Sequence, residues 1–259
     1  MNDIRVSSWS ELNEQLYTGT WQEPLARFRG SFAYRGVAQA SADLSTTLTR
    51  LGSQAEAHLL RNFRKYAHRD AVPGDSIWNW LALAQHHGLP TRLLDWTFSP
   101  LVAMHFATAD LQQYEVDAAI WRADYTKIHQ LLPEQLRQIL KAEDADVFTA
   151  EMLSRAAHTL HEFDHQAGEP FALFFEPPSL DDRIVNQFAL FSLVSSPTAR
   201  LDHWLERHPE LYSRVIIPAA LKWEIRDKLD QANITERVLF PGLDGLGRWL
   251  TRYYTPKSH

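Results

Sequence analysis

The sixteen residues from Gln85 to Pro100 constrain this chain more than any other stretch. They read QHHGLPTRLLDWTFSP and combine two histidines, a Gly-x-Pro turn, an arginine, an aspartate, a tryptophan and a Thr-x-Ser-Pro element. A segment that serves packing alone shows periodic apolar positions with polar residues between them. Because this segment has no such period, we expect its polar side chains to form a site where structural elements meet.

Local signals predict a helix, a turn, a strand and a second helix around this stretch. Ser76 suits the N-cap of an amphipathic helix, and the Gly-x-Pro turn ends that helix because proline cannot continue its hydrogen-bond ladder. The Leu-Leu pair that follows suits a short buried strand. Ser99 and Pro100 then begin a helix rich in alanine and phenylalanine.

Composition limits the class of protein. With 259 residues and 45% hydrophobic content, the chain can bury a full core as one large domain. A net charge of −6 gives no general attraction to nucleic-acid phosphates, although a local basic groove is compatible with it. The absence of cysteine excludes disulfides and thiolate chemistry and is typical of a cytoplasmic protein. The N-terminus lacks a signal-peptide core and no apolar run reaches spanning length, so we expect no membrane association.

The remaining pattern predicts an α+β fold in a single domain, with a small mixed or antiparallel sheet flanked by helices. The expected strands lie at 32–36, 93–94, 118–121, 171–175, 188–194, 214–218 and, as an apolar strand, 238–241. The expected helices lie at 8–19, 55–63, 76–84, 101–107, 133–166 and 219–232, with a closing helix from Leu243. The helical segment 133–166 is charged and suits an insertion. Gly242 to Gly247 matches no phosphate-loop spacing and suits a turn that starts a helix.

The stretch from Gln85 to Pro100 resembles the central signature of the FRG domain family. That signature reads roughly Q-H-x-G-x-P-T-R-L-L-D-W-T-x-S-P and is followed by an alanine- and phenylalanine-rich helix. Arg35 and Gly36 resemble the Phe-Arg-Gly motif that names the family, with Tyr34 at the phenylalanine position. Arg50, at the end of a leucine-rich extended segment, matches a second family arginine fifteen positions on. The literal Phe-Arg-Gly at 28–30 lacks such a partner.

A late element also resembles the family. Arg183, Gln187 and Phe191 follow its R-I-x-x-Q-x-x-x-F pattern. The resemblance implies one bacterial-type FRG domain over residues 1–259, with a signature core at 25–110 and 171–255 and the helical insertion at 133–166.

The order of these motifs is similar to that of the arginine–serine–glutamate ADP-ribosyltransferases. The resemblance therefore implies an ADP-ribosyltransferase-like fold and an NAD-binding enzyme, toxin or defence effector, without a metal and with an unidentified protein or nucleic-acid acceptor. In this class the arginine grips the dinucleotide, here Arg35, and the Thr-x-Ser strand, here Thr97 and Ser99, orients the nicotinamide ribose. The catalytic candidates are Arg35, His87, Thr97, Ser99 and Gln187, and the cofactor-binding candidates are Tyr34, Arg35, Gly36, His86, Arg92, Asp95, Trp96 and Arg183.

Several of these assignments have open alternatives. The late element carries Gln187 where such enzymes place a glutamate, so the carboxylate could be Asp95, Glu176 or Asp182. Arg92 could form a buried ion pair with Asp95 that holds the strand. Gly36 would leave room for an anion to approach the backbone.

Two other functions compete with the transferase. The first is a non-catalytic module that binds a ligand, a partner or nucleic acid, including a role in phage defence. The second is a zinc metallopeptidase, because His161, Glu162 and His165 spell H-E-x-x-H. Asp164 inside that motif and phenylalanine at position 171, where an extended motif places a third histidine, count against the peptidase.

Overall fold

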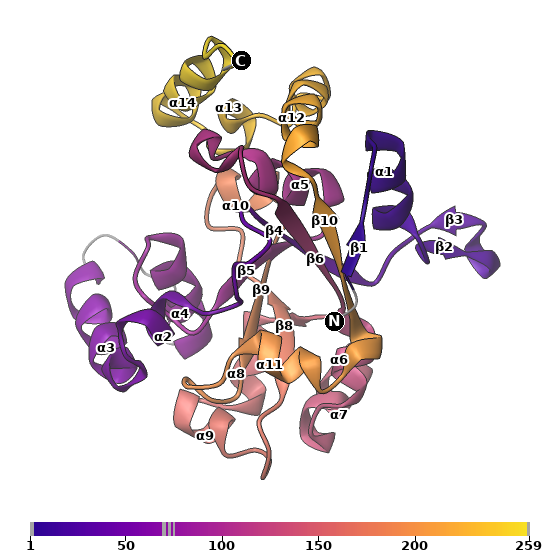
Figure 1. Cartoon of the computed structure of the whole chain (residues 1–259). Coiled ribbons are helices and arrows are strands. Elements are labelled where there is room, and N and C mark those ends of the chain that lie inside the picture. The colour runs from indigo at the N-terminus through magenta and orange to yellow at the C-terminus, as the bar shows by residue number, and fades with distance from the viewer. Residues whose placement is uncertain (1–2, 69–70, 72–73, 75, 258–259) are drawn as a thin grey trace.

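One mixed sheet of eight strands organises the computed structural model, which describes residues 3–68, 71, 74 and 76–257 (Figure 1). The strand order is β1-β10-β6-β4-β5-β9-β8-β7. Only β1 with β10 and β7 with β8 pair in parallel; the other neighbours are antiparallel. The strands are β1 (Asp3–Arg5), β4 (Phe32–Val37), β5 (Leu94–Thr97), β6 (Ala118–Asp124), β7 (Phe148–Thr149), β8 (Ala172–Glu176), β9 (Ala189–Val194) and β10 (Tyr212–Ile217). The predicted α+β class with a mixed sheet is confirmed, and the sheet is larger than expected.

The sheet consists of two halves that meet at a narrow joint. β4 pairs with β6 along all six of its residues, whereas β4 and β5 pair only at Tyr34 and Thr97. β5 continues into the second half through four pairs with β9. The sheet therefore opens between β4 and β5, and this opening positions the candidate site.

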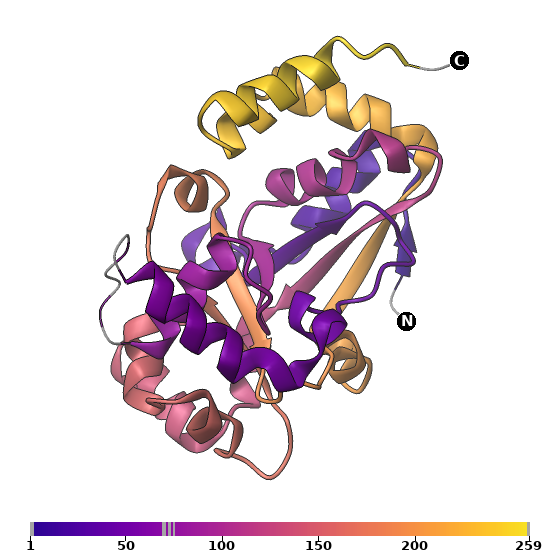
Figure 2. The same ribbon diagram turned by 90° about the vertical axis from the view of Figure 1, so that its left-hand side faces the viewer.

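Fourteen α-helices surround the sheet in the described part of the chain (Figures 1 and 2). They are α1 (Trp9–Tyr17), α2 (Thr47–Leu51), α3 (Glu56–Ala67), α4 (Ile77–His86), α5 (Pro100–Thr108), α6 (Tyr125–Gln130), α7 (Glu134–Ala142), α8 (Ala150–Ala156), α9 (Leu160–Asp164), α10 (Asp182–Asn186), α11 (Leu201–Glu206), α12 (Lys222–Gln231), α13 (Glu236–Leu239) and α14 (Leu243–Tyr253). Helices α1, α5 and α12 pack on the half that contains β4, β6 and β10. None of the described helices combines the length and the apolar character needed to cross a membrane.

The largest core lies on the other half of the sheet. Trp78 of α4 is fully buried, and its ring packs edge-on against Phe163 of α9 at 5.0 Å between centroids and against Phe175 of β8 at 6.3 Å. Helices α7 and α8 add leucines to the same cluster. The segment 133–166 is thus built into the main core, and burial of its large side chains stabilises the fold.

Capping residues fix the helices on both sides of the signature, as predicted. The Ser76 hydroxyl accepts a hydrogen bond from the Asn79 amide at the start of α4, and the Ser99 hydroxyl accepts one from Val102 at the start of α5. After α4 the chain turns at Gly88, whose φ of +79° lies in the left-handed region that glycine tolerates.

Three segments differ from the expected secondary structure. Residues around Arg50 form the short helix α2 instead of an extended segment, because Thr46 caps it through the Thr49 amide. Segment 133–166 contains the edge strand β7 besides its helices. Residues 236–239 form α13, not an apolar strand, and the Gly242 turn then begins α14 as predicted.

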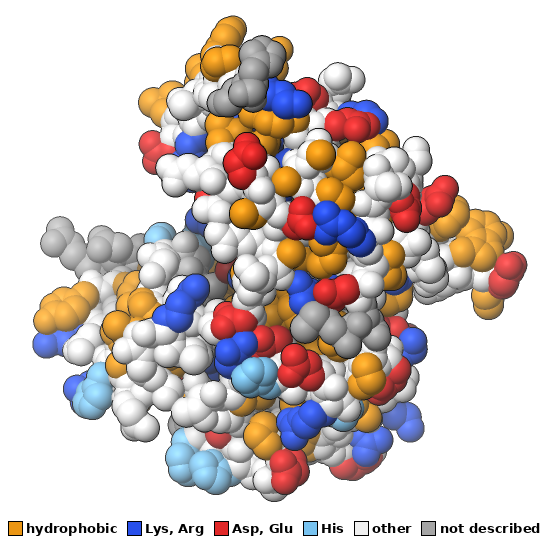
Figure 3. Space-filling view, in the orientation of Figure 1, with side chains coloured by type: hydrophobic (Ala, Val, Ile, Leu, Met, Phe, Trp, Pro, Cys, Tyr) orange, Lys and Arg blue, Asp and Glu red, His pale blue; other side chains and the backbone are white. Residues whose placement is uncertain are grey.

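A small hairpin outside the main sheet was not predicted. It consists of β2 (Trp21–Gln22) and β3 (Arg27–Phe28) and projects from the body at the right of Figures 1 and 3. The exposed rings of Trp21 and Phe28 contact each other edge-on at 5.0 Å. The literal Phe-Arg-Gly triplet starts on this hairpin, away from the joint between β4 and β5.

Candidate functional site

A cavity of about 270 Å³ lies at the joint between β4 and β5, and we call it the joint cavity. It gathers eight of the twelve predicted site residues. Its lining consists of Tyr34, Arg35, Gly36, Asp95, Trp96, Thr97, Phe106, Arg183, Gln187 and Ala189. The signature, the naming motif and the late element, which lie far apart in the sequence, therefore meet in one place.

Arg35 is the main cation of the joint cavity. Its Nη1 donates a hydrogen bond to the backbone carbonyl of Asp95, so the side chain spans β4 and β5 beyond their single residue pair. Its Nε is buried and has no hydrogen-bond partner within the described structure. Burial lowers the pKa of Arg35 and Asp95 opposes this effect, but an arginine remains charged at neutral pH. A fixed guanidinium with an unused donor is suited to binding an anionic or hydroxylated ligand.

Asp95 places a carboxylate beside this guanidinium. Its Oδ2 accepts a hydrogen bond of 2.9 Å from Gln85 of α4, and Gln85 in turn accepts one from the Thr91 hydroxyl. Sequence reasoning did not assign a role to Gln85 or Thr91, although both belong to the signature. Both act as positioning residues, because their hydrogen bonds fix the orientation of the Asp95 side chain.

Aromatic rings held by hydrogen bonds form the walls of the joint cavity. The Tyr34 hydroxyl donates to the Leu16 carbonyl at 2.8 Å, and the Trp96 indole donates to the Ser192 hydroxyl at 2.8 Å. Both side chains are almost fully buried, so neither ring can swing freely. Phe106 of α5 completes the lining.

Gly36 has a packing role that corrects the expectation of ligand approach. A Cβ at this position would lie 1.9 Å from the Ala103 carbonyl oxygen and 2.7 Å from the Ala107 amide nitrogen. The space that glycine leaves is therefore filled by α5, which lies directly against β4. Gly36 still lines the joint cavity, but its missing side chain serves the contact between helix and strand.

Hydrogen bonds to the backbone occupy the polar groups of Thr97, Ser99 and Gln187. The Thr97 hydroxyl donates to the Gln187 carbonyl at 2.7 Å and accepts from the Ser99 amide at 3.0 Å. The Gln187 side-chain amide donates to the Leu239 carbonyl at 2.8 Å. Ser99 caps α5 and lies outside the lining of the joint cavity. These contacts tie β5, α10 and α13 together at the cavity.

Arg92 is also outside the joint cavity, and the expected ion pair with Asp95 is wrong. Arg92 Nε donates to Glu56 at 2.7 Å, Nη2 bonds the second Glu56 oxygen, and both terminal nitrogens bond Asp164. The arginine is 4% exposed. Asp164, which interrupts the H-E-x-x-H motif, thus serves as a partner of the signature arginine.

A larger cavity of about 600 Å³ lies beside the first, and we call it the outer cavity. Arg183 lines both cavities, and the predicted residues His86 and His87 line the outer one. His86 Nε2 lies 2.8 Å from a carboxylate oxygen of Asp181, which ties the end of α4 to the start of α10. The outer lining consists of His86, His87, Asp181, Asp182, Arg183, Phe240, Pro241, Asp244 and Arg248.

The H-E-x-x-H residues do not form a three-ligand site. The rings of His161 and His165 stack at 4.2 Å, and Glu162 accepts a hydrogen bond from the His158 amide, as a helix cap does. Within the described ranges, no group of three His, Cys, Asp or Glu side chains is arranged to hold a metal ion. The motif therefore lacks the third protein ligand that a catalytic zinc site uses.

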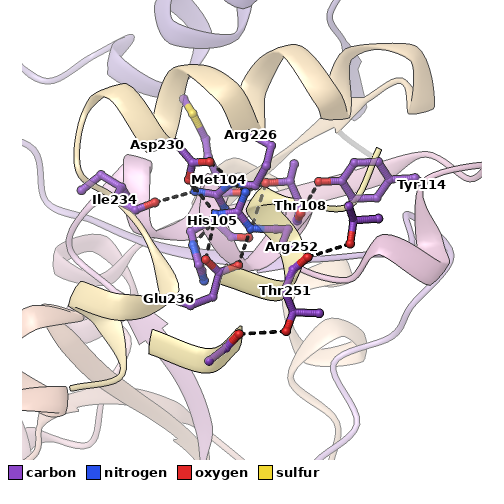
Figure 4. A network of polar contacts seen from close by, with 12 residues as sticks. Met104, His105, Thr108, Tyr114, Arg226, Asp230, Ile234, Glu236, Thr251 and Arg252 are labelled. Carbon is purple, nitrogen blue, oxygen red and sulfur yellow. Dashed lines mark hydrogen bonds and ion pairs between the residues drawn. The ribbon is translucent and has the colours of Figure 1, made fainter. Parts of the chain in front are cut away.

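A buried polar network anchors the C-terminal helices, and α14 with the turn before it lines the outer cavity (Figure 4). Arg252 of α14 bonds Glu236 and Asp230, while Arg226 of α12 donates to Nδ1 of His105 at 2.9 Å. Burial, reinforced by the charge of Arg226, lowers the pKa of His105 to about 3, so this histidine is neutral. Sequence reasoning missed this network because its members lie on four separate helices.

The comparison with known protein families gives a match to one segment of the chain. A family model described as the FRG domain matches residues 30–116, which run from the naming motif through the signature and α5. The chain therefore contains an FRG domain in this segment. No curated protein and no solved structure matches the chain.

Proposed function

We propose that the joint cavity binds the nicotinamide nucleoside part of NAD and that the protein is an NAD-consuming, ADP-ribosyltransferase-like enzyme. One observation carries the proposal: the half-buried guanidinium of Arg35 and the oriented, exposed carboxylate of Asp95 face a small cavity walled by aromatic rings. Clefts that combine apolar walls with a few convergent polar groups are the usual form of small-molecule sites.

The charges of the joint cavity suit the parts of a dinucleotide. The unpartnered Nε of Arg35 and the guanidinium of Arg183 offer donors to diphosphate or ribose oxygens. The rings of Trp96 and Phe106 offer apolar surface to a planar base. The charge of Arg50 contributes to the lowered pKa of Arg35, so Arg50 lies near it. This second cation adds to the positive potential at this edge of the sheet.

The proposed reaction breaks the bond between the nicotinamide nitrogen and C1′ of the ribose. The bonding electrons leave with the nitrogen, so that neutral nicotinamide departs and the ribose becomes an oxocarbenium ion. Asp95 stabilises this developing positive charge electrostatically. Water or an acceptor nucleophile then bonds C1′ and loses one proton, which yields ADP-ribose or an ADP-ribosylated acceptor, a protein or a nucleic acid.

The test is nicotinamide release from NAD, with cell extract present as a source of acceptors. We expect release by the wild type and a loss of about 100-fold or more in Arg35→Ala and Asp95→Asn, since each removes a charge that acts in the transition state. Arg29→Ala is the matched control, because Arg29 belongs to the literal Phe-Arg-Gly triplet and is exposed away from the cavity. Equal release by all four proteins would refute the assignment of the site.

A second function, ligand binding without turnover, is favoured by one observation. Thr97 and Gln187, the predicted catalytic hydroxyl and amide, already use their groups in hydrogen bonds to the backbone. A binding module predicts that NAD raises the melting temperature of the wild type but not of Arg35→Ala, while neither protein releases nicotinamide.

A further inference from the structure

We infer that the outer cavity holds the adenosine 5′-phosphate half of NAD, with the diphosphate passing Arg183 at the junction of the two cavities. This inference rests on the proposed binding of NAD and assigns Arg248, Phe240, Asp182 and Asp244 to the site.

The continuity of the two cavities is the first argument. Arg183 is a lining residue of both, so a ligand that passes its guanidinium reaches from one to the other. At about 270 Å³ the joint cavity is too small for a whole dinucleotide, because sites for drug-sized ligands have roughly 300–1,000 Å³. The outer cavity supplies about 600 Å³ more, next to the same arginine. The adenosine 5′-phosphate half of the ligand, which is the larger half, therefore fits the outer cavity.

The second argument is a pair of arginines held on one aromatic ring. The guanidinium carbon of Arg183 lies 5.1 Å from the centre of the Phe240 ring, and that of Arg248 lies 5.5 Å from it. Neither side chain makes a hydrogen bond or ion pair with another residue in the described part of the chain. Both guanidinium groups therefore have donors free for a ligand, and one guanidinium binds two phosphate oxygens at once through parallel N–H···O bonds.

The third argument concerns the carboxylates, which select a nucleotide over a simple anion. Asp182 and Asp244 line the same cavity and are exposed. They would repel free phosphate, but a ribose linked to phosphate presents hydroxyl groups that donate to carboxylates, as in other dinucleotide sites. A ligand with phosphates for the arginines and hydroxyls for the aspartates satisfies both sets of groups.

Close packing of α14 holds the backbone of Phe240. A Cβ on Gly245 would lie 1.8 Å from the Phe240 carbonyl oxygen, so the first turn of α14 packs tightly against this residue. The network of Arg252 with Glu236 and Asp230 fixes α14 to α13 and α12. The backbone of Phe240 is thus held in place by α14, and its ring packs edge-on against Phe106 at 6.2 Å between centroids.

The experiment is calorimetric titration of two partial ligands, ADP and nicotinamide mononucleotide, into wild type, Arg248→Ala and Arg237→Ala. Arg237 is the matched control, because its guanidinium also lies over an aromatic ring, that of Trp249, but lines neither cavity. We expect Arg248→Ala to weaken ADP binding about 10- to 100-fold, the usual effect of losing a charged hydrogen bond, and to leave the mononucleotide within about twofold. Arg237→Ala should bind both as the wild type does.

The outcomes separate this inference from the proposed catalysis. ADP binding that depends on Arg248, in a protein that releases no nicotinamide, would support the nucleotide site and refute the turnover. Two results would overturn the inference and leave the catalysis standing. In both, the wild type releases nicotinamide; in one it does not bind ADP, and in the other all three proteins bind ADP equally. A wild type without affinity for either partial ligand would overturn the inference as well.

Discussion

Replacement of Arg92 by methionine tests whether this signature residue holds the fold together. Arg92 is 4% exposed and bonds two carboxylates, Glu56 of α3 and Asp164 of α9. Methionine fills much of the same volume but leaves both carboxylates without their cation. Removal of one partner of a buried ion pair costs about 3–5 kcal/mol. For a domain of this size the melting temperature should fall by roughly 6–20 °C.

Chemical denaturation of the purified variants measures this change in the free energy of unfolding. Arg61→Met on the exposed face of α3 is the control and should change it by less than about 0.5 kcal/mol. Addition of Glu56→Gln to Arg92→Met should restore part of the loss, because it removes one of the unpaired charges. A loss below about 1 kcal/mol in Arg92→Met, or no recovery in the double variant, would refute the reasoning.

Three further predictions concern the packing, the pH dependence and the histidine motif. Gly36→Ala should lower the free energy of unfolding in urea by about 1–3 kcal/mol, because the added carbon meets the backbone of α5 at Ala103 and Ala107. An unchanged unfolding midpoint would contradict this close contact. Burial opposes ionisation of Glu236, but the hydrogen bonds and charge of Arg252 outweigh burial and lower the pKa of Glu236. The ionised Glu236 therefore stabilises the fold fully above its ordinary pKa of about 4.3, and this stabilisation is lost as the pH falls through the lower folded-state pKa. Glu236→Gln should therefore lose less stability than the wild type between pH 7 and 3; equal losses would contradict this. His161→Ala should leave zinc content and melting temperature unchanged, and a loss of bound zinc in elemental analysis would restore the metallopeptidase hypothesis.

Local chemistry explains which parts of the fold were predictable from sequence. The caps at Ser76 and Ser99 act within three residues, so the sequence alone places the starts of their helices. The partners of Arg92 lie 36 and 72 positions away, and no local pattern specifies them. The nearest carboxylate in sequence, Asp95, was the wrong choice, because Arg92 lies in a bend before β5 and bonds carboxylates of α3 and α9 instead.

The candidate site likewise contains residues that the sequence predicts and residues that it does not. The residues of the joint cavity come from motifs that resemble the family, and their meeting follows from the register of β4, β5 and β9. Phe240 and Arg248 of the outer cavity lie in a segment expected to begin as a strand. Their position depends on the network around Arg252 and on the close packing at Gly245, which involve helices distant in the sequence.

A crystal structure of the Asp95→Asn variant with NAD would test the central claim most directly, because this variant should bind the dinucleotide without consuming it. The account predicts the nicotinamide ribose in the joint cavity beside Arg35 and the diphosphate at Arg183. NAD bound with its nicotinamide away from Arg35, or bound outside both cavities, would contradict it.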